Sequence, residues 1–161
     1  MAYEKVLLIR DSREHEGYGY NWGEDDWTKG TKIDALSVGD YSIAGLEHLI
    51  FVDRKQTVSE LAKNITEPRF LRLIEKAKKF KYRFLICEFS MDDIAKYPVG
   101  SEIPPKMWKA IRIRPKFIKI WLTKIAIEYG IQIILAGNTK EAEDICYNIL
   151  KTIHKLESKN V

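Results

Sequence analysis

Cysteine is scarce in this sequence, which has only Cys87 and Cys146 among 161 residues. Both lie in apolar patterns, and neither belongs to a CxxC pair or a Cys/His cluster. The sequence therefore predicts buried thiols in a reducing compartment, without a disulfide framework or a structural zinc site. No apolar run approaches the roughly 18 residues that a membrane span needs. The short apolar run after Glu4 does not fit a signal peptide, because an acid precedes it.

Internal repeats, low-complexity tracts and linkers are also absent from the sequence. A length of 161 residues fits one domain with a sizeable hydrophobic core, so we expect a single domain over residues 1–161. The net charge of +4 is compatible with a nucleic-acid partner but does not establish one. The placement of the charges is therefore more informative than their sum.

Apolar periodicity indicates an α/β fold. Short continuous apolar runs predict buried strands, and runs with a period near 3.6 residues predict helices. The predicted strands cover residues 6–9, 32–36, 82–89 and 131–135, and the main predicted helices cover residues 68–80 and 115–129 and a segment after Asn138. Residues 11–30 lack periodicity and predict a long loop, and residues 91–105 give only a weak pattern. A strand, a crossover helix and a strand in this order favour parallel neighbours in a sheet.

The stretch from Gly39 to Lys55 combines two acids with a lysine. Residues 41–43 and 48–52 predict a β-hairpin that brings Asp40 close to Asp53. Alternate residues of a strand share a face, so Asp53 and Lys55 point to one side and Arg54 to the other. Asp11, at the end of the first buried strand, is placed to supply a third carboxylate.

Two carboxylates and an ammonium suit metal-dependent hydrolysis of a phosphodiester. Hard cations such as Mg²⁺ or Mn²⁺ prefer oxygen ligands and keep open positions for water. A lysine beside the metal can orient the water, help to deprotonate it or balance negative charge. The alternative is structural: Gly39-Asp40 forms a turn and Asp53-Arg54-Lys55 is a solvated strand end. Thr57 and Glu60 predict a helix cap, and Glu60 is open to either a capping or a site role.

Acids are missing from residues 103–127, a stretch rich in lysine and arginine. Contacts of such side chains with phosphates give affinity that does not depend on base sequence. The predicted nucleic-acid contacts are Lys106, Lys109, Arg112, Arg114 and Lys116. The lysines of residues 76–81 are interpreted as a solvated helix face. Trp121 is predicted to lie in the core, and Trp108 is open between the core and base stacking. Glu88, which ends a buried strand, is a further candidate acid.

The order of these motifs resembles the nuclease domain of the XPF family of structure-specific endonucleases, within the PD-(D/E)xK superfamily. The residues that carry the likeness are Asp11-Ser-Arg13-Glu14, Gly39-Asp40 and Asp53-Arg54-Lys55, and the likeness extends to the C-terminal part. The compact nuclease-only proteins of phages and prokaryotes are most similar. Asp53 departs from the family pattern, which has glutamate there, one methylene longer. The family's acid after this motif would fall on Ser59, and Glu60 comes one residue later.

The resemblance implies a restriction-endonuclease-like fold, with a mixed central sheet and flanking helices. It implies Asp11, Asp40 and Asp53 as ligands of Mg²⁺ or Mn²⁺ and Lys55 as the catalytic lysine. Arg13, Glu14 and Arg54 would support the scissile phosphate or hold the site together. The implied activity is a divalent-metal-dependent endodeoxyribonuclease that cuts branched or flapped DNA in replication, recombination or repair.

The resemblance also implies partners and a location. We expect DNA, a homodimer through the C-terminal helices, and a helicase or recombination protein as a further candidate partner. The expected location is the cytoplasm of a prokaryotic or phage-infected cell, associated with the nucleoid and away from membranes. One alternative is a catalytically inactive DNA-binding scaffold subunit. Another is a metal-independent enzyme of the tRNA-splicing type, but His15, His48 and His154 are not placed for that chemistry.

Overall fold

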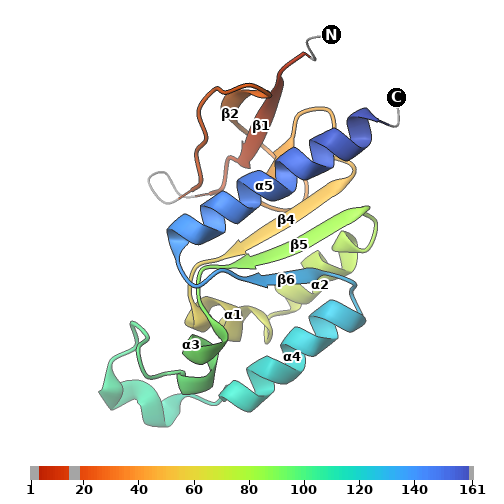
Figure 1. The fold of residues 1–161 in the computed structure, drawn as a ribbon. Helices are drawn as coiled ribbons and strands as arrows, with labels where there is room; N and C mark the ends of the chain where they lie inside the picture. The colour runs from red at the N-terminus through yellow and green to blue at the C-terminus, as the bar shows by residue number, and fades with distance from the viewer. Residues whose placement is uncertain (1–3, 15–18, 160–161) are drawn as a thin grey trace.

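The computed structural model describes residues 4–14 and 19–159 (Figure 1). Its strands are β1 (Val6–Asp11), β2 (Thr28–Asp34), β3 (Tyr41–Ile43), β4 (Ile50–Lys55), β5 (Tyr82–Cys87) and β6 (Gln132–Leu135). Its helices are α1 (Val58–Asn64), α2 (Pro68–Ala77), α3 (Met91–Lys96), α4 (Pro115–Ile127) and α5 (Thr139–Ser158), with the 3₁₀ helix η1 (Pro105–Ala110). Within the described ranges no helix is long and apolar enough to cross a membrane.

The strands form two three-stranded sheets. Strands β4, β5 and β6 run parallel, and helical crossovers connect them, as parallel neighbours require. In the other sheet β1 is central, parallel to β2 and antiparallel to β3. The predicted α/β class, with mixed strand directions and flanking helices, is confirmed.

Strand β4 is buried on both faces, which explains its nearly unbroken apolar start. Phe51 belongs to a core cluster with residues of α1, α2 and α4, whereas Val52 belongs to a second cluster with residues of α5. Figure 1 shows the same arrangement, with α5 on one side of the β4–β5–β6 sheet and α1, α2 and α4 on the other. The alternation of side chains along β4 therefore directs successive residues into two different environments.

The predicted hairpin is wrong. Strand β3 pairs with β1 through Leu8↔Ile43 and its neighbours, and not with the residues before Asp53. Residues 44–49 turn instead of extending the strand, and β4 takes β5 as its partner. One hydrogen bond, from Asp40 N to Val52 O at 2.7 Å, still holds the start of β3 beside β4. The expected proximity of Asp40 to β4 thus arises by a different route.

The other differences concern short elements. The strand predicted at residues 32–36 corresponds to β2, which begins earlier, at Thr28, and ends at Asp34. Strand β2 pairs in parallel with β1 despite its polar composition. The weak stretch after residue 90 contains α3, which Ser90 and Asp93 begin with a capping box. Part of the predicted loop after Asp11, residues 15–18, lies outside the described residues.

Candidate active site

A cleft of about 430 Å³ lies at the carboxyl end of β4. The acids Asp40 and Asp53 and the lysine Lys55 all line it, together with Asp11 and Arg13 from the end of β1. Because parallel strands bring their carboxyl ends to one edge of a sheet, such edges commonly carry ligand sites. The cleft is thus the place where the predicted acids and the predicted lysine meet.

Gly39 allows Asp40 to approach β4. Its φ is +90°, a conformation that side chains disfavour, and an added Cβ would lie only 3.1 Å from Val52 O. The chain can therefore pass close enough for Asp40 N to donate to Val52 O. The Asp40 carboxylate also accepts a hydrogen bond from the backbone N–H of Arg54 at 2.7 Å. Both contacts fix Asp40 against the strand that carries Asp53.

Asp53 and Lys55 point to the same side of β4 and are both buried, with 5% and 6% exposure. The Lys55 Nζ atom lies 3.0 Å from Asp53 Oδ2. That approach is an ion pair in distance but not a hydrogen bond in angle, so Oδ2 has no hydrogen-bond partner among the described residues. Lys55 also lies over the Phe70 ring, 4.8 Å from its centroid. The ammonium thus contacts both Asp53 and the Phe70 ring, and Asp53 Oδ2 has this ion pair but accepts no hydrogen bond from the described residues.

The electrostatics of the cleft reflect crowding of carboxylates. Burial, and then the negative charges of Asp53 and Glu14, raise the pKa of Asp40 well above its usual range. Burial lowers the pKa of Lys55, but the charges of Asp53 and Glu60 outweigh this effect and raise it overall. Lys55 is therefore an ammonium at neutral pH, and a further positive charge between Asp40 and Asp53 would be favourable.

Asp11 is already fully engaged. Its Oδ2 accepts from Arg13 Nε at 2.8 Å, and its Oδ1 accepts from Leu36 N at 2.8 Å. In the described part of the chain no group of three or more acidic, histidine or cysteine residues lies close enough to hold a metal ion. The structure therefore brings Asp40 and Asp53 together but does not add Asp11 to them as a preformed third ligand.

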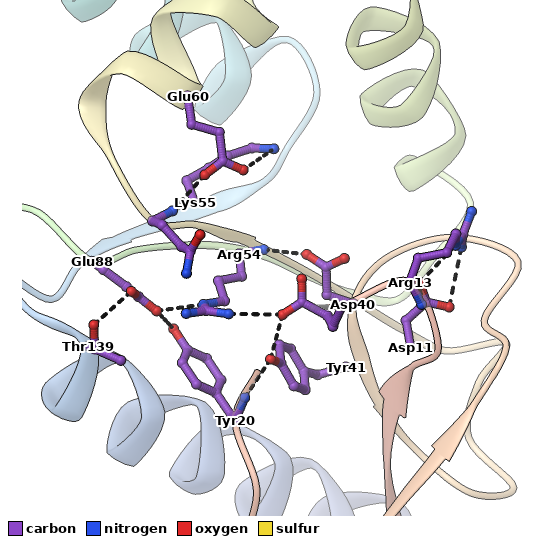
Figure 2. A network of polar contacts seen from close by, with 12 residues as sticks. Asp11, Arg13, Tyr20, Asp40, Tyr41, Arg54, Lys55, Glu60, Glu88 and Thr139 are labelled. Atoms are coloured by element: carbon purple, nitrogen blue, oxygen red, sulfur yellow. Dashed lines mark hydrogen bonds and ion pairs between the residues drawn. The ribbon is translucent and has the colours of Figure 1, made fainter. Parts of the chain in front are cut away.

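Arg54 lies on the other face of β4, in a buried polar network (Figure 2). Its Nε donates to Glu88 Oε2 at 2.6 Å, and its Nη1 donates to Glu14 Oε2 at 3.1 Å. The guanidinium also lies over the Tyr20 ring, 4.6 Å from the centroid. Arg54 thus joins β4, the residue after β5 and the loop after β1.

Tyr20, Tyr41 and Thr139 complete this network. Thr139, in the first turn of α5, donates a hydrogen bond to Glu88 Oε1 at 2.9 Å. The Tyr20 hydroxyl donates to Glu88 at 2.6 Å, and the Tyr41 hydroxyl donates to Glu14 at 2.7 Å. The two rings stack with centroids 4.9 Å apart. No periodic pattern in the sequence points to Tyr20 or Thr139. Glu88 carried a signal only as an acid that follows a buried strand.

The predicted nucleic-acid contacts do not line the cleft. None of them is among its lining residues, although all five are exposed on η1, on the segment after it or at the start of α4. The predicted set is Lys106, Lys109, Arg112, Arg114 and Lys116. Trp108, beside them, is partly buried and donates its ring N–H to Ile103 O at 2.9 Å. The cleft is lined instead by basic residues of α2, which the sequence had assigned in part to a solvated face.

Comparison with known proteins agrees with this architecture. The sequence matches the ERCC4 domain over residues 11–149. The fold is similar to XPF from Aeropyrum pernix, with a TM-score of 0.64 and 17% identity over 95% of this chain and 67% of that chain. It is also similar to XPF from Aeropyrum pernix in complex with DNA, with a TM-score of 0.64 and 16% identity over 94% and 66% of the two chains.

No curated protein sequence matches the chain. The chain spans about two thirds of the length of the two archaeal proteins, so the likeness concerns their shared fold. The ERCC4 match, in contrast, extends from Asp11 at the end of β1 into α5 and includes every residue that lines the cleft. The chain therefore belongs to the ERCC4 domain family and has the XPF-type nuclease fold.

Proposed function

We propose that the protein is a metal-dependent DNA endonuclease whose reaction takes place in the cleft at the end of β4. One observation carries this proposal: Asp40, Asp53 and Lys55 converge there, and the buried Oδ2 of Asp53 lies beside Lys55 without accepting a hydrogen bond from the described residues. Membership of the ERCC4 family, which groups nuclease domains, supports the same conclusion.

The residues fit a divalent cation such as Mg²⁺ or Mn²⁺. Two neighbouring carboxylates in a partly buried site repel each other, and hard cations prefer oxygen ligands. We propose Asp40 and Asp53 as the protein ligands, and Asp11 as a third ligand that Arg13 must release first. When bound, the cation supplies charge neutralisation at the phosphate and a more acidic water.

The chain's own residues would bind and orient the phosphate. Lys55, held as an ammonium beside Asp53, can donate to a phosphate oxygen and offset its negative charge as the reaction proceeds. Arg13, whose side chain is 59% exposed, faces the same cleft and can add a second charged contact once it leaves Asp11. Glu14 and Arg54 act through the buried network that positions Asp40.

For the substrate we propose branched or flapped DNA, in replication, recombination or repair. We propose that the exposed basic side chains between positions 106 and 116 contact DNA outside the cleft. Such contacts need to recognise only the phosphates of the DNA. A protein that recognises DNA shape gains most of its affinity from such contacts. A helicase or recombination protein remains a proposed partner, and the nucleoid a proposed location.

We also propose a homodimer through the C-terminal helices. Helix α4 exposes Phe117, Ile120 and Ile127, the last of which is 82% exposed. A second apolar surface lies between β5 and α5, where Phe84, Ile149 and their neighbours line a shallow groove. Sedimentation at micromolar concentration should report a dimer, and a purely monomeric mass would contradict this part of the proposal.

The activity can be tested with labelled duplex, flap, fork and four-way-junction DNA in Mn²⁺, Mg²⁺ or EDTA. We expect cleavage of at least one branched substrate, dependent on the divalent ion. Lys55→Ala and Asp53→Asn should each lower the rate by roughly 10²- to 10⁴-fold, the usual effect of losing a residue that moves or balances charge. Asp92→Asn, which changes an exposed carboxylate outside the cleft, is the matched control.

Three outcomes are informative. Absence of divalent-dependent cleavage with every substrate would refute the endonuclease proposal. If binding to branched DNA persisted in that case, the inactive scaffold would become the better explanation. Equal cleavage by wild type and Asp53→Asn would show that the reaction takes place elsewhere or comes from a contaminant.

A further inference from the structure

Helix α2 carries a row of basic residues along one side of the cleft. Arg69, Arg72 and Lys76 line the same cleft as Asp53 and Lys55, and all three are exposed. They are separated by three and four positions, the spacing that places side chains on one face of a helix. An adjoining face of α2 buries Phe70 and Ile74 in the core, so the row has a fixed orientation.

The charges of this row are not neutralised by the protein. Among residues 4–14 and 19–159, no carboxylate lies within ion-pair distance of any of the three. Lys78, on the same helix, does form such a pair with Glu75 at 3.1 Å. Glu67 also lines the cleft, but it accepts a hydrogen bond from Asn64 Nδ2 at 3.1 Å. The row is thus available to an external anion.

We propose that Arg69, Arg72 and Lys76 bind consecutive phosphates of the DNA strand that is cut, adjacent to the scissile phosphate. This inference rests on the proposed function and extends it to the path of the substrate. A helix rises about 1.5 Å per residue, so the row spans roughly 10 Å. Each strand of a duplex carries one phosphate per about 3.4 Å of the duplex axis, and successive phosphates lie farther apart than this because the strand winds round the axis. The row can therefore reach about two to three consecutive phosphates.

The distribution of charge in the cleft explains why a strand needs this row. Asp40 and Asp53 repel a phosphate unless cations lie nearby, and Lys55 is already paired with Asp53. The basic residues of α2 supply positive charge next to these acids, whereas the basic residues of 106–116 do not line the cleft. The row of α2 is thus the part of the basic surface that can hold a strand while it is cut.

The test compares wild type with the triple variant Arg69→Gln/Arg72→Gln/Lys76→Gln. Binding to labelled branched DNA is measured by fluorescence anisotropy in EDTA, at several salt concentrations. Each phosphate contact contributes about 0.9 to the slope of log K against log salt, so the slope should fall by about 2 to 3. The control is Lys140→Gln/Lys155→Gln/Lys159→Gln, which removes three exposed lysines of α5 or its end, none of which lines the cleft. Its slope should change by less than about 1, because it removes no proposed phosphate contact.

Cleavage kinetics provide a second readout. The triple variant should raise KM by at least tenfold and retain most of kcat at saturating DNA, because Lys55 and the acids are intact. An unchanged salt slope together with an unchanged KM would overturn the inference, as would an equal loss in the α5 control. A thermal melt should be the same for all three proteins, since the six substituted side chains are exposed.

Failure of this inference and failure of the proposed function are separable. If wild type cuts DNA but the triple variant keeps its slope and KM, the function stands and the role of α2 is wrong. If wild type binds DNA without cutting, the salt slope alone still decides the role of α2. If wild type does not bind DNA under any condition, both are refuted.

Discussion

Replacing Arg54 with methionine should lower the free energy of unfolding by about 3 to 5 kcal/mol, the usual cost of breaking a buried ion pair from one side. The Arg54 and Glu88 side chains are each only 4% exposed, and Nε lies 2.6 Å from the carboxylate. Without the arginine, Glu88 is a buried charge that retains only the hydroxyls of Tyr20 and Thr139. Glu14, at 16% exposure, loses the same partner but can reach water more easily.

The network predicts a ranking of variants as well as a single value. Glu88→Gln keeps a hydrogen-bond acceptor for Tyr20 and leaves Arg54 paired with Glu14, so it should cost only about 1 to 3 kcal/mol. The double variant Arg54→Met/Glu88→Met removes both buried charges and should be more stable than Arg54→Met alone. Lys32→Met is the control, because its pair with Asp34 is half exposed and should contribute under about 1 kcal/mol.

Urea denaturation followed by circular dichroism, in metal-free buffer near pH 7, measures all four variants. For a chain of this length, 3 to 5 kcal/mol also corresponds to a loss of roughly 6 to 20 °C in Tm. A cost of less than about 1 kcal/mol for Arg54→Met would contradict the assignment of a buried ion pair, as would a double variant no more stable than Arg54→Met alone.

The remaining predictions concern the cleft and the core. Asp40→Asn should raise the free energy of unfolding in metal-free buffer, because it removes the cost of burying a carboxylate and the repulsion with Asp53, the causes that raise the pKa of Asp40. Mn²⁺ at 100 times its Kd should stabilise wild type by about 2.7 kcal/mol but stabilise this variant far less, and equal thermal shifts would contradict the ligand assignment. Gly39→Ala should cost about 1 to 2 kcal/mol in urea denaturation and slow cleavage, because φ is +90°. Burial raises the pKa of Cys87 and Cys146 and so lowers the thiolate fraction; a thiol reagent at pH 8 should therefore react only after unfolding, and rapid labelling of the native protein would contradict it.

The orientation of Asp53, Arg54 and Lys55 could be predicted from the sequence because strand alternation is local. Apolar residues before Asp53 fix the strand, and a period of two then determines which side chains share a face. The same holds for the helices, whose apolar stripes predicted α2, α4 and α5. In each case a few neighbouring residues contain all the information needed.

The position of Asp40 could be predicted only for the wrong reason. The hairpin assigned β3 to β4 from proximity along the chain, whereas β3 pairs with β1, more than thirty positions earlier. Nothing local distinguishes these two partners, since a three-residue strand has too few side chains to encode a register. Glycine at position 39 was the better signal, because a close approach of two backbone segments requires a residue without Cβ.

The role of α2 was out of reach for a related reason. Helical periodicity shows that Arg69, Arg72 and Lys76 share a face, but it does not show what that face meets. A lysine- and arginine-rich face is usually solvated, and that interpretation is sound until the sheet edge beside it is known. The DNA contacts were predicted in residues 103–127 instead, because the sequence shows directly that this stretch contains no acid. It does not show which basic residues lack a carboxylate nearby in the folded protein.

Asp53 and Lys55 lie on one face of β4 and Arg54 on the other, and the two faces have different roles. Asp53 and Lys55 reach the cleft, where their charges can meet a cation and a phosphate, whereas the side chain of Arg54 is directed into the buried network with Glu14 and Glu88. The backbone N–H of Arg54 nevertheless binds the Asp40 carboxylate. Arg54 therefore links the buried network to an acid of the cleft. Of the two supporting roles open to Arg54, contact with the phosphate or holding the site together, its geometry favours the second.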